Sequence, residues 1–192
     1  LKVLDPEFES SRPEGRAEIF CSDIFLEDEL KPETHLGSSG RTRAVVKVQD
    51  GCNANCSFCV IPSVRGRSRS LDPAAVVKEV SQLVERGYKE VVFSGIHLGT
   101  YGRDLDGKTS LYELIHQTLE RVPALERLRL SSIEPLEVTP EIVSLVASHP
   151  RMAHHFHIPF QSGSRRVLRE MRRPYPPEYY SGLVRSIREG LP

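Results

Sequence analysis

The chain has 192 residues, and its 26 basic and 26 acidic side chains give a formal net charge of zero. Hydrophobic residues make up 39% and aromatic residues 7%, which is typical of a globular domain and excludes collagen, a coiled coil or a disordered tail. No apolar run approaches the roughly 20 residues that cross a bilayer, and the first residues do not form a signal peptide. We therefore expect a protein without a membrane partner.

Charges of one sign gather in separate parts of the chain. Residues 1–35 hold ten acids and four bases, residues 41–70 hold six bases and one acid, and residues 161–192 hold seven arginines and three acids. Such blocks are usually solvated surface, but arginine-rich segments beside a chemical motif commonly contact phosphates. We interpret residues 1–40, which close with a glycine- and serine-rich break at 37–40, as an acidic interdomain connector.

Beyond the connector, apolar β-branched runs alternate with amphipathic stretches that begin at helix-capping residues. The pattern predicts helices that begin after Asp72, Ser110 and Thr139. It also predicts a short helix over 164–171, a longer helix over 177–189, and strands over 43–48, 90–95, 128–132 and 155–159.

This alternation predicts an α/β fold with parallel strands and outer helices. Four βα units are too few to close a barrel, so we expect a partial (β/α) barrel that is truncated after about four units. The chain starts at Leu1 and stops at Pro192, where another strand would be expected. We therefore interpret it as an excerpt from a longer protein.

Three of the four cysteines, Cys52, Cys56 and Cys59, fall within eight residues directly after the first predicted strand, whereas Cys21 stands alone in the connector. An odd and closely spaced cluster does not suit disulfides, and without a secretory signal it favours a metal site in a reducing compartment, the cytoplasm. Structural zinc usually takes four protein ligands, so three cysteines with no fourth Cys or His nearby fit it poorly; a zinc-bound RNA-binding module is kept as the alternative. An iron–sulfur cube takes one thiolate per iron, so three cysteines leave one iron open for a substrate or cofactor.

The spacing Cys-x3-Cys-x2-Cys, with Phe58 before the third cysteine, resembles the radical S-adenosylmethionine (SAM) enzymes. The resemblance implies a partial (β/α) barrel, a [4Fe-4S] cluster and SAM, with residues 41–192 as the N-terminal part of the radical SAM core domain. In that superfamily the open iron binds the amino and carboxylate groups of SAM. An electron from the cluster then cleaves the sulfonium and gives a 5′-deoxyadenosyl radical that abstracts hydrogen from the substrate.

The segments around the cysteines narrow the resemblance to the methylthiotransferases, over about residues 41–180. Members that act on isopentenyladenosine in tRNA or on a ribosomal protein typically carry a glutamine after the second strand. This chain has Gly95, Ile96 and His97 there, like the branch that adds a methylthio group to N6-threonylcarbamoyladenosine next to the tRNA anticodon. The resemblance implies that reaction, with the other two branches as alternatives. Its motifs lie at 46–52, 60–70, 94–102, 130–135, 157–163 and 171–173.

The resemblance also assigns roles to residues, each with a plainer alternative. Phe58 is expected near the adenine or in the core, and His97 at the methionine amino group or in a structural role. Glu134 is expected at the cofactor or in solvent. Ser132 is expected at the cofactor or in a turn after the third strand, and Gln161 is expected at the cofactor or in the N-cap region of the following helix. The predicted cluster ligands are Cys52, Cys56 and Cys59, and the predicted SAM-binding residues are Phe58, Ser94, Gly95, His97, Ser132, Glu134 and Gln161.

Arginines that follow the cysteine motif, and others in the second basic block over 161–192, predict contacts with tRNA, because a guanidinium can bind phosphate and can stack on an unpaired base. Strand alternation places His155 and His157 on one face, for packing or for tRNA contact. The family further implies an electron donor protein and a second [4Fe-4S] cluster in an N-terminal domain, so we expect this chain alone to lack complete sulfur insertion. The RNA-binding candidates are Arg65, Arg67, Arg69, Arg172 and Arg173.

Overall fold

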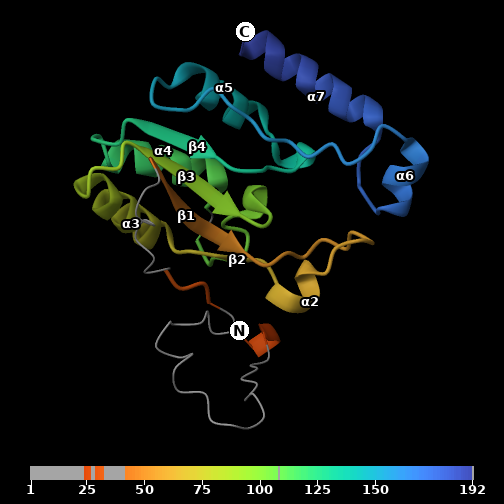
Figure 1. Ribbon diagram of the computed structural model, residues 1–192, viewed down its shortest axis with the longest axis horizontal. Coiled ribbons are helices and arrows are strands. Elements are labelled where there is room, and N and C mark those ends of the chain that lie inside the picture. The colour runs from red at the N-terminus through yellow and green to blue at the C-terminus, as the bar shows by residue number, and fades with distance from the viewer. Residues whose placement is uncertain (1–23, 27–28, 33–41, 108, 192) are drawn as a thin grey trace, which may run out of the picture.

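The computed structural model describes residues 24–26, 29–32, 42–107 and 109–191. Most of the connector predicted over residues 1–40, including Cys21 and the break at 37–40, lies outside the described residues. The described residues form one sheet with helices packed along it (Figure 1). None of the helices in this part of the chain is long and apolar enough to cross a membrane.

The sheet has four strands in the order β2-β1-β3-β4. β1 (Arg43–Asp50), β3 (Glu90–Gly95) and β4 (Arg127–Leu130) run parallel, as the sequence predicted. β2 (Arg69–Ser70) pairs antiparallel with the last two residues of β1, and the sequence did not predict it because two residues carry no periodicity. Parallel strands end at the same edge of a sheet, so the loops that follow β1, β3 and β4 share that edge.

The helices begin where capping residues predicted them. The carboxylate of Asp72 accepts hydrogen bonds from the backbone N–H groups of Ala74 and Ala75, and Ser110 and Thr139 cap the next two helices in the same way. The short helix α2 was not predicted. The α-helices are α2 (Ile61–Arg65), α3 (Pro73–Glu85), α4 (Leu111–Arg121), α5 (Pro140–Ser148), α6 (Arg165–Glu170) and α7 (Pro177–Gly190), and the 3-10 helices are η1 (Ile24–Leu26), η2 (Leu98–Thr100) and η3 (Pro135–Glu137).

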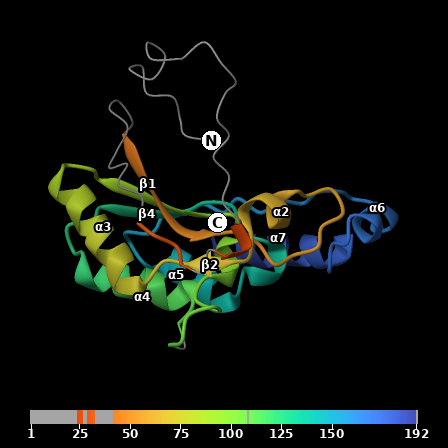
Figure 2. The same ribbon diagram turned by 90° about the horizontal axis from the view of Figure 1, so that it is seen from below.

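Helices α3, α4 and α5 cover one face of the sheet (Figure 2). Alternate strand residues, such as Val46 and Phe93, are fully buried against the apolar stripes of these helices. Each such side chain stabilises the fold by about 1.5–3 kcal/mol through burial. On the opposite face Val45 is 52% exposed, so the sheet is open on the side that forms the inside of a partial barrel.

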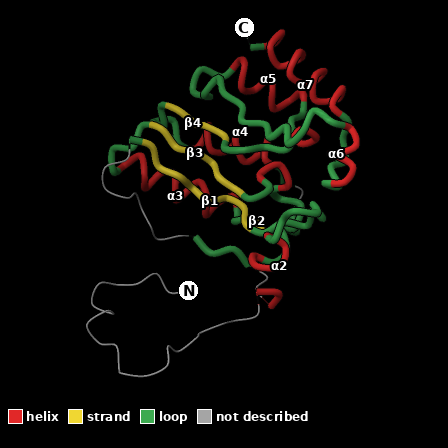
Figure 3. The backbone as a smooth tube through the Cα atoms, turned by 45° about the vertical axis from the view of Figure 1, so that its right-hand side comes forward, coloured by secondary structure: helices red, strands yellow, loops and turns green. Residues whose placement is uncertain are grey.

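The predicted strand over 155–159 is wrong. This segment meets β4 and its continuation only through isolated parallel bridges, at Met152 and at His157, and otherwise runs as a loop (Figure 3). The backbone N–H of His155 bonds within its own segment, to the carbonyl of Ala153 at 2.7 Å, and Pro159 has no N–H to donate. The backbone therefore cannot continue a regular ladder there.

Glu90 joins three strands on the open face. Its carboxylate lies 2.6 Å from Nε of Arg129 on β4, 3.8 Å from Arg43 on β1 and 4.0 Å from Arg127 on β4. One carboxylate therefore lies among the positive charges of three arginines, at the end of the sheet where the parallel strands begin.

Candidate cluster and cofactor site

The three clustered thiols lie on one loop, between β1 and α2 at the carboxyl end of the sheet. Cys52 and Cys56 are half-buried, Cys59 is exposed, and all three are free thiols. Burial raises the pKa of the Cys56 thiol; Arg173 opposes this effect, while Glu134, Cys52 and Cys59 add to it. The three sulfurs therefore lie close enough to interact electrostatically.

The donor set of this loop suits an iron–sulfur cluster. Within the described residues, no three His, Cys, Asp or Glu side chains are arranged to hold a single metal ion. A [4Fe-4S] cube places a different iron at each thiolate, so its ligands need not converge on one point. Three soft thiolates on an accessible loop fit that requirement, and they leave one iron without a protein ligand.

Backbone contacts hold the cysteine loop at both ends. The N–H of Cys52 donates to the carbonyl of Gly66 at 3.1 Å, and the N–H of Ser57 donates to the carbonyl of Met171, after α6, at 3.3 Å. Gly51 has a φ of 70°, and a Cβ there would overlap the carbonyl oxygen of Arg67. The loop is therefore fixed against the segments on either side of it.

Gln49 is a functional residue that the sequence analysis missed. Its side chain is fully buried, and Nε2 lies 2.8–2.9 Å from the carbonyl oxygens of Asp50 and Gly51 and from Oγ of Ser68. Its Oε1 accepts a hydrogen bond from the backbone N–H of His97 at 2.8 Å. Gln49 thus ties the start of the cysteine loop to the loop after β3. Periodicity gave no signal for this role, because Gln49 shares the open face of β1 with Val45 and Lys47, where a polar side chain is ordinary.

Asp50 anchors two of the basic residues near the loop. It lies 3.2 Å from Nζ of Lys47 and 3.3 Å from Nη1 of Arg65. Burial alone would raise the pKa of Asp50, but the Gly51 N–H, Lys47 and Arg65 together hold that pKa below its usual value. Arg65 is half-exposed and remains ion-paired with the protein itself.

The other predicted RNA-binding arginines differ in exposure. Arg67 and Arg172 are exposed, whereas Arg69 is buried and donates from Nη2 to the carbonyl of Arg65 at 2.9 Å. Arg173 is also largely buried, with 8% of its side chain exposed. The structure therefore presents Arg67 and Arg172 to a large ligand more readily than Arg69 and Arg173.

Arg173 connects two predicted cofactor-binding residues. Its guanidinium pairs with the Glu134 carboxylate at 2.8 Å and lies 5.6 Å from the centre of the Phe58 ring. Phe58 is 53% exposed, so it is not the core aromatic that was its alternative. Glu134 is ion-paired and mostly buried, so it is not the solvent acid that was its alternative.

His97 faces the first cysteine. Its Nδ1 lies 3.6 Å from Sγ of Cys52, and its Nε2 lies 3.5 Å from the carboxylate of Glu137, which Arg103 also contacts at 2.6 Å. The hydrogen bonds to Cys52 and Glu137 raise the pKa of His97 to about 9. Burial would raise the pKa of Cys52, but the hydrogen bonds from His97 and from the Ala54 N–H lower it.

The remaining predicted residues lie around this centre. Ser94 and Gly95 end β3, and Gly95 packs against the side chain of Gln49. Ser132 follows β4, and its backbone forms an isolated parallel β-bridge with that of His157. Gln161 is exposed before α6 with a φ of 67°, and α6 is capped by Ser164. Hydrogen bonds in the described part of the chain do not link Gln161 to the cysteine loop.

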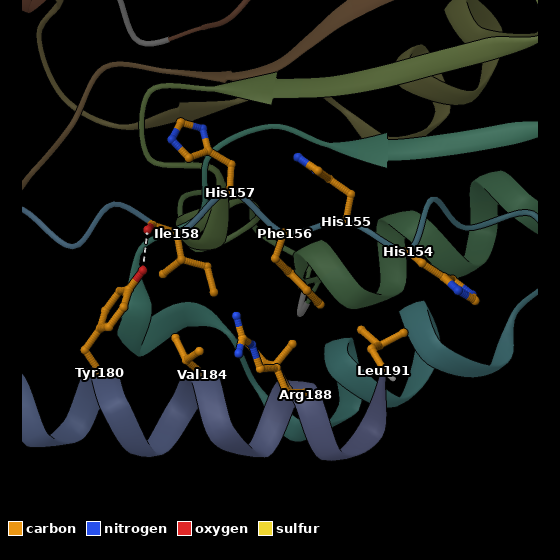
Figure 4. Close-up of a pocket in the computed structure, with 10 residues that line it drawn as sticks. His154, His155, Phe156, His157, Ile158, Tyr180, Val184, Arg188 and Leu191 are labelled. Atoms are coloured by element: carbon orange, nitrogen blue, oxygen red, sulfur yellow. Dashed lines mark hydrogen bonds between the residues drawn. The ribbon is translucent and has the colours of Figure 1, made fainter.

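A cavity of about 450 Å³ lies elsewhere, between residues 154–158 and α7 (Figure 4). His155 and His157 point together toward the sheet, as alternation predicted, whereas Phe156 and Ile158 point toward α7. None of the cysteine-loop residues lines this cavity.

The chain is similar to curated proteins along its whole length. The chain is 43% identical over 193 residues to "Threonylcarbamoyladenosine tRNA methylthiotransferase MtaB" of Bacillus subtilis, an alignment that covers 100% of this chain and 42% of that protein. It is 39% identical over 191 residues to "tRNA-2-methylthio-N(6)-dimethylallyladenosine synthase" of Carboxydothermus hydrogenoformans, again over 100% of this chain and 42% of that protein. The chain thus spans less than half the length of these relatives.

A solved structure shares the fold. The radical S-adenosylmethionine methyltransferase TsrM from Kitasatospora setae, solved with cobalamin and a [4Fe-4S] cluster bound, matches with a TM-score of 0.61 at 21% identity, over 76% of this chain and 28% of that one. This match confirms the predicted partial barrel. The family model described as the Radical SAM superfamily matches residues 46–192, which is most of the chain and includes the cysteine loop. The chain belongs to the radical SAM superfamily.

Proposed function

We propose that the whole protein is a tRNA methylthiotransferase that adds a methylthio group to N6-threonylcarbamoyladenosine next to the anticodon. One observation carries the proposal. The three-thiol loop at the end of β1 stands in a chain that is 43% identical, over its full length, to a protein named for that reaction. The dimethylallyladenosine synthases at 39% identity or below make the isopentenyladenosine branch the second candidate.

Three cysteines would hold the cluster in this proposal, through the sulfurs of Cys52, Cys56 and Cys59. When bound, the cluster supplies the electron that cleaves SAM and so makes the carbon of the base reactive. Ser94 and Gly95 end the strand next to β1, at the edge where parallel barrels place their ligand groups. Their backbone would meet the amino end of SAM.

The face around Phe58 would hold the rest of the cofactor. The Phe58 ring is 53% exposed and would offer an aromatic surface to the adenine, while the guanidinium of Arg173, paired with Glu134, lies over the ring. Ser132 and Gln161 are further cofactor contacts in this proposal. The exposed Arg67 and Arg172 would bind tRNA phosphates, as clustered arginines commonly do.

The proposal includes parts that lie beyond this chain. A second [4Fe-4S] cluster in an N-terminal domain would complete the sulfur chemistry, and a partner protein would supply the electron. Residues 41–192 would belong to the radical SAM core and residues 1–40 to its connection with the preceding domain. Three free thiols favour a reducing compartment, so we place the protein in the cytoplasm.

Anaerobic reconstitution with iron and sulfide tests the class of the site. We expect about four irons per chain and a visible absorption band that changes on addition of SAM. Cys56→Ser should abolish both, whereas Cys21→Ser, which alters the cysteine outside the cluster, should retain them. Stoichiometric zinc without such a band would instead support the zinc-bound RNA-binding module.

The substrate branch is tested in cells that lack the full-length gene. Mass spectrometry of their tRNA should show threonylcarbamoyladenosine without its methylthio group, while methylthiolated isopentenyladenosine persists. The reverse pattern would assign the protein to the isopentenyladenosine branch. Loss of neither modification would contradict a tRNA substrate.

A further inference from the structure

We propose that His97 donates a hydrogen bond from Nδ1 to the sulfur of Cys52 and thereby raises the reduction potential of the cluster, with Gln49 and Glu137 as positioning residues. This inference rests on the proposed cluster at the cysteine loop. It assigns His97 to the cluster ligand rather than to the amino group of SAM.

The sulfur of Cys52 differs from the other two cysteine sulfurs in that hydrogen-bond donors lie next to it. Nδ1 of His97 lies 3.6 Å from Sγ, and the backbone N of Ala54 lies 3.4 Å from it; both distances suit hydrogen bonds to sulfur. Within the described residues, the sulfurs of Cys56 and Cys59 accept no such bond. Any effect of hydrogen bonding on the cluster would therefore act mainly through Cys52.

Gln49 fixes the backbone of His97. The Oε1 atom of Gln49 accepts the His97 N–H at 2.8 Å, while Nε2 lies 2.8 Å from the carbonyl of Gly51, the residue before Cys52. One buried amide thus holds the peptide that carries the donor ring and the peptide that leads to the acceptor sulfur. Gln49 therefore helps to set the distance between ring and sulfur by holding both backbones.

Glu137 fixes the ring itself. Its carboxylate lies 3.5 Å from Nε2 of His97, so Nδ1 is directed toward the cysteine side. Arg103 holds the other oxygen of Glu137 at 2.6 Å, and Gly99 lets the carboxylate approach because a Cβ there would overlap the Glu137 side chain. An outer carboxylate that orients a histidine in this way is a recurring arrangement around metal centres.

A hydrogen bond to a ligand sulfur favours the reduced cluster. Reduction adds one negative charge that spreads over the sulfurs, and a donor stabilises the more negative state more strongly. The effect is enhanced because the His97 ring is mostly shielded from solvent. Nε2 faces the Glu137 carboxylate and Nδ1 faces the Cys52 sulfur, and neither partner has a proton to give once the sulfur is a cluster ligand. Both ring nitrogens therefore carry a proton in this arrangement, and Nδ1 is the donor.

A redox titration of the reconstituted 192-residue chain tests the proposal, because the second cluster proposed for the N-terminal domain is then not titrated with it. Electron paramagnetic resonance without SAM follows the reduced cluster. His97→Ala should lower the equilibrium constant for one-electron reduction about tenfold, which corresponds to about 59 mV toward more negative potential. His97→Asn keeps an N–H group near the position of Nδ1 and should recover most of this loss. Glu137→Gln should give an intermediate value, because the ring is less firmly directed.

The matched control is His116→Ala, since His116 is an exposed histidine on α4 that contacts Glu120 and Tyr112 of its own helix. It should leave the potential unchanged. A His97→Ala protein that binds a full cluster at the wild-type potential would overturn the inference while leaving the proposed function intact. A wild-type protein that takes up no four-iron cluster would instead overturn the proposed function.

A second measurement needs no substitution. In the wild-type protein with its histidines labelled with ¹⁵N, pulsed electron paramagnetic resonance of the reduced cluster should show a weak hyperfine coupling to a histidine nitrogen. It should also show a coupling to an exchangeable proton, whose signal disappears in D₂O. Absence of both couplings would overturn the inference even if the alanine variant failed to fold.

Discussion

Gly51 occupies a backbone position that other residue types cannot take without moving their neighbours. Its φ of 70° lies in the left-handed region, and a side chain would overlap the carbonyl of Arg67. This turn directs the chain from β1 into the cysteine loop. Cys52, the first of the proposed cluster ligands, is therefore placed by a steric constraint on the residue before it.

We predict that Gly51→Ala lowers the free energy of unfolding by about 3 kcal/mol, because the strain of a left-handed alanine adds to the overlap with Arg67. Gly87→Ala is the matched control, since Gly87 has a φ of 92° but open space around it, and should cost about 1 kcal/mol. Urea denaturation measures both. Equal losses would show that the loop yields to the added methyl group.

The Glu134–Arg173 pair is a second constraint at the scale of single residues. Glu134→Gln would leave the guanidinium, 8% exposed, without its carboxylate. We predict a loss of about 2 kcal/mol in the free energy of unfolding. Glu170→Gln is the control, because its pair with Arg166 is solvent-exposed and should contribute less than about 0.5 kcal/mol. Equal effects in denaturant titrations would contradict the structural role of Glu134.

At the scale of elements, charged residues on the open face help to set the order of the strands. Glu90 on β3 lies between arginines on β1 and β4, so its carboxylate acts across three neighbouring strands. The apolar side chains on the opposite face pack against the helices, but they do not favour one neighbouring strand over another. Glu90 therefore contributes specificity to a sheet whose stability comes mainly from the buried face.

We predict that Glu90→Gln destabilises the protein by about 2 kcal/mol at low ionic strength, because three arginines then face one another without a counter-charge. Added salt should reduce the deficit, since salt screens the repulsion among the exposed groups. Glu126→Gln, which removes an exposed pair with Lys89, should change stability by less than about 0.5 kcal/mol at any salt concentration. A salt-independent deficit would assign the effect of Glu90 to packing.

At the scale of the whole molecule, the rigid sheet carries a site built from loops. The cysteine loop extends away from the buried core and meets the segment after α6, which belongs to a distant part of the sequence (Figure 1). A loop with few buried side chains opens more readily than the strands that carry it. Cluster binding would therefore stabilise one region rather than the whole fold.

We predict that loading the cluster slows amide hydrogen exchange about tenfold over residues 52–66, because three ligand bonds close the loop. Exchange in β3 and α4 should stay the same, since these elements are buried in the core. Exchange measured by mass spectrometry with and without the cluster tests this. A uniform slowing across the chain would indicate that the fold depends on the cluster as a whole.

The sequence predicted most of the elements because their signals are local. Capping by Asp72, Ser110 and Thr139, and β-branched runs such as 43–48, act within a few residues of each other. The wrong strand over 155–159 and the missed β2 are the cases in which pairing with another part of the chain decides the structure.

The sequence by itself determined the spacing of three cysteines on one loop, the positions of three parallel strands along the chain and the family to which the chain belongs. Only the tertiary structure decided which side chains surround those cysteines. Gln49 meets His97, His97 meets Glu137, and Arg173 meets Glu134, each across 39 to 48 residues of sequence. Such encounters depend on the register of the parallel strands, which brings distant loops to one edge of the sheet and which no local pattern encodes.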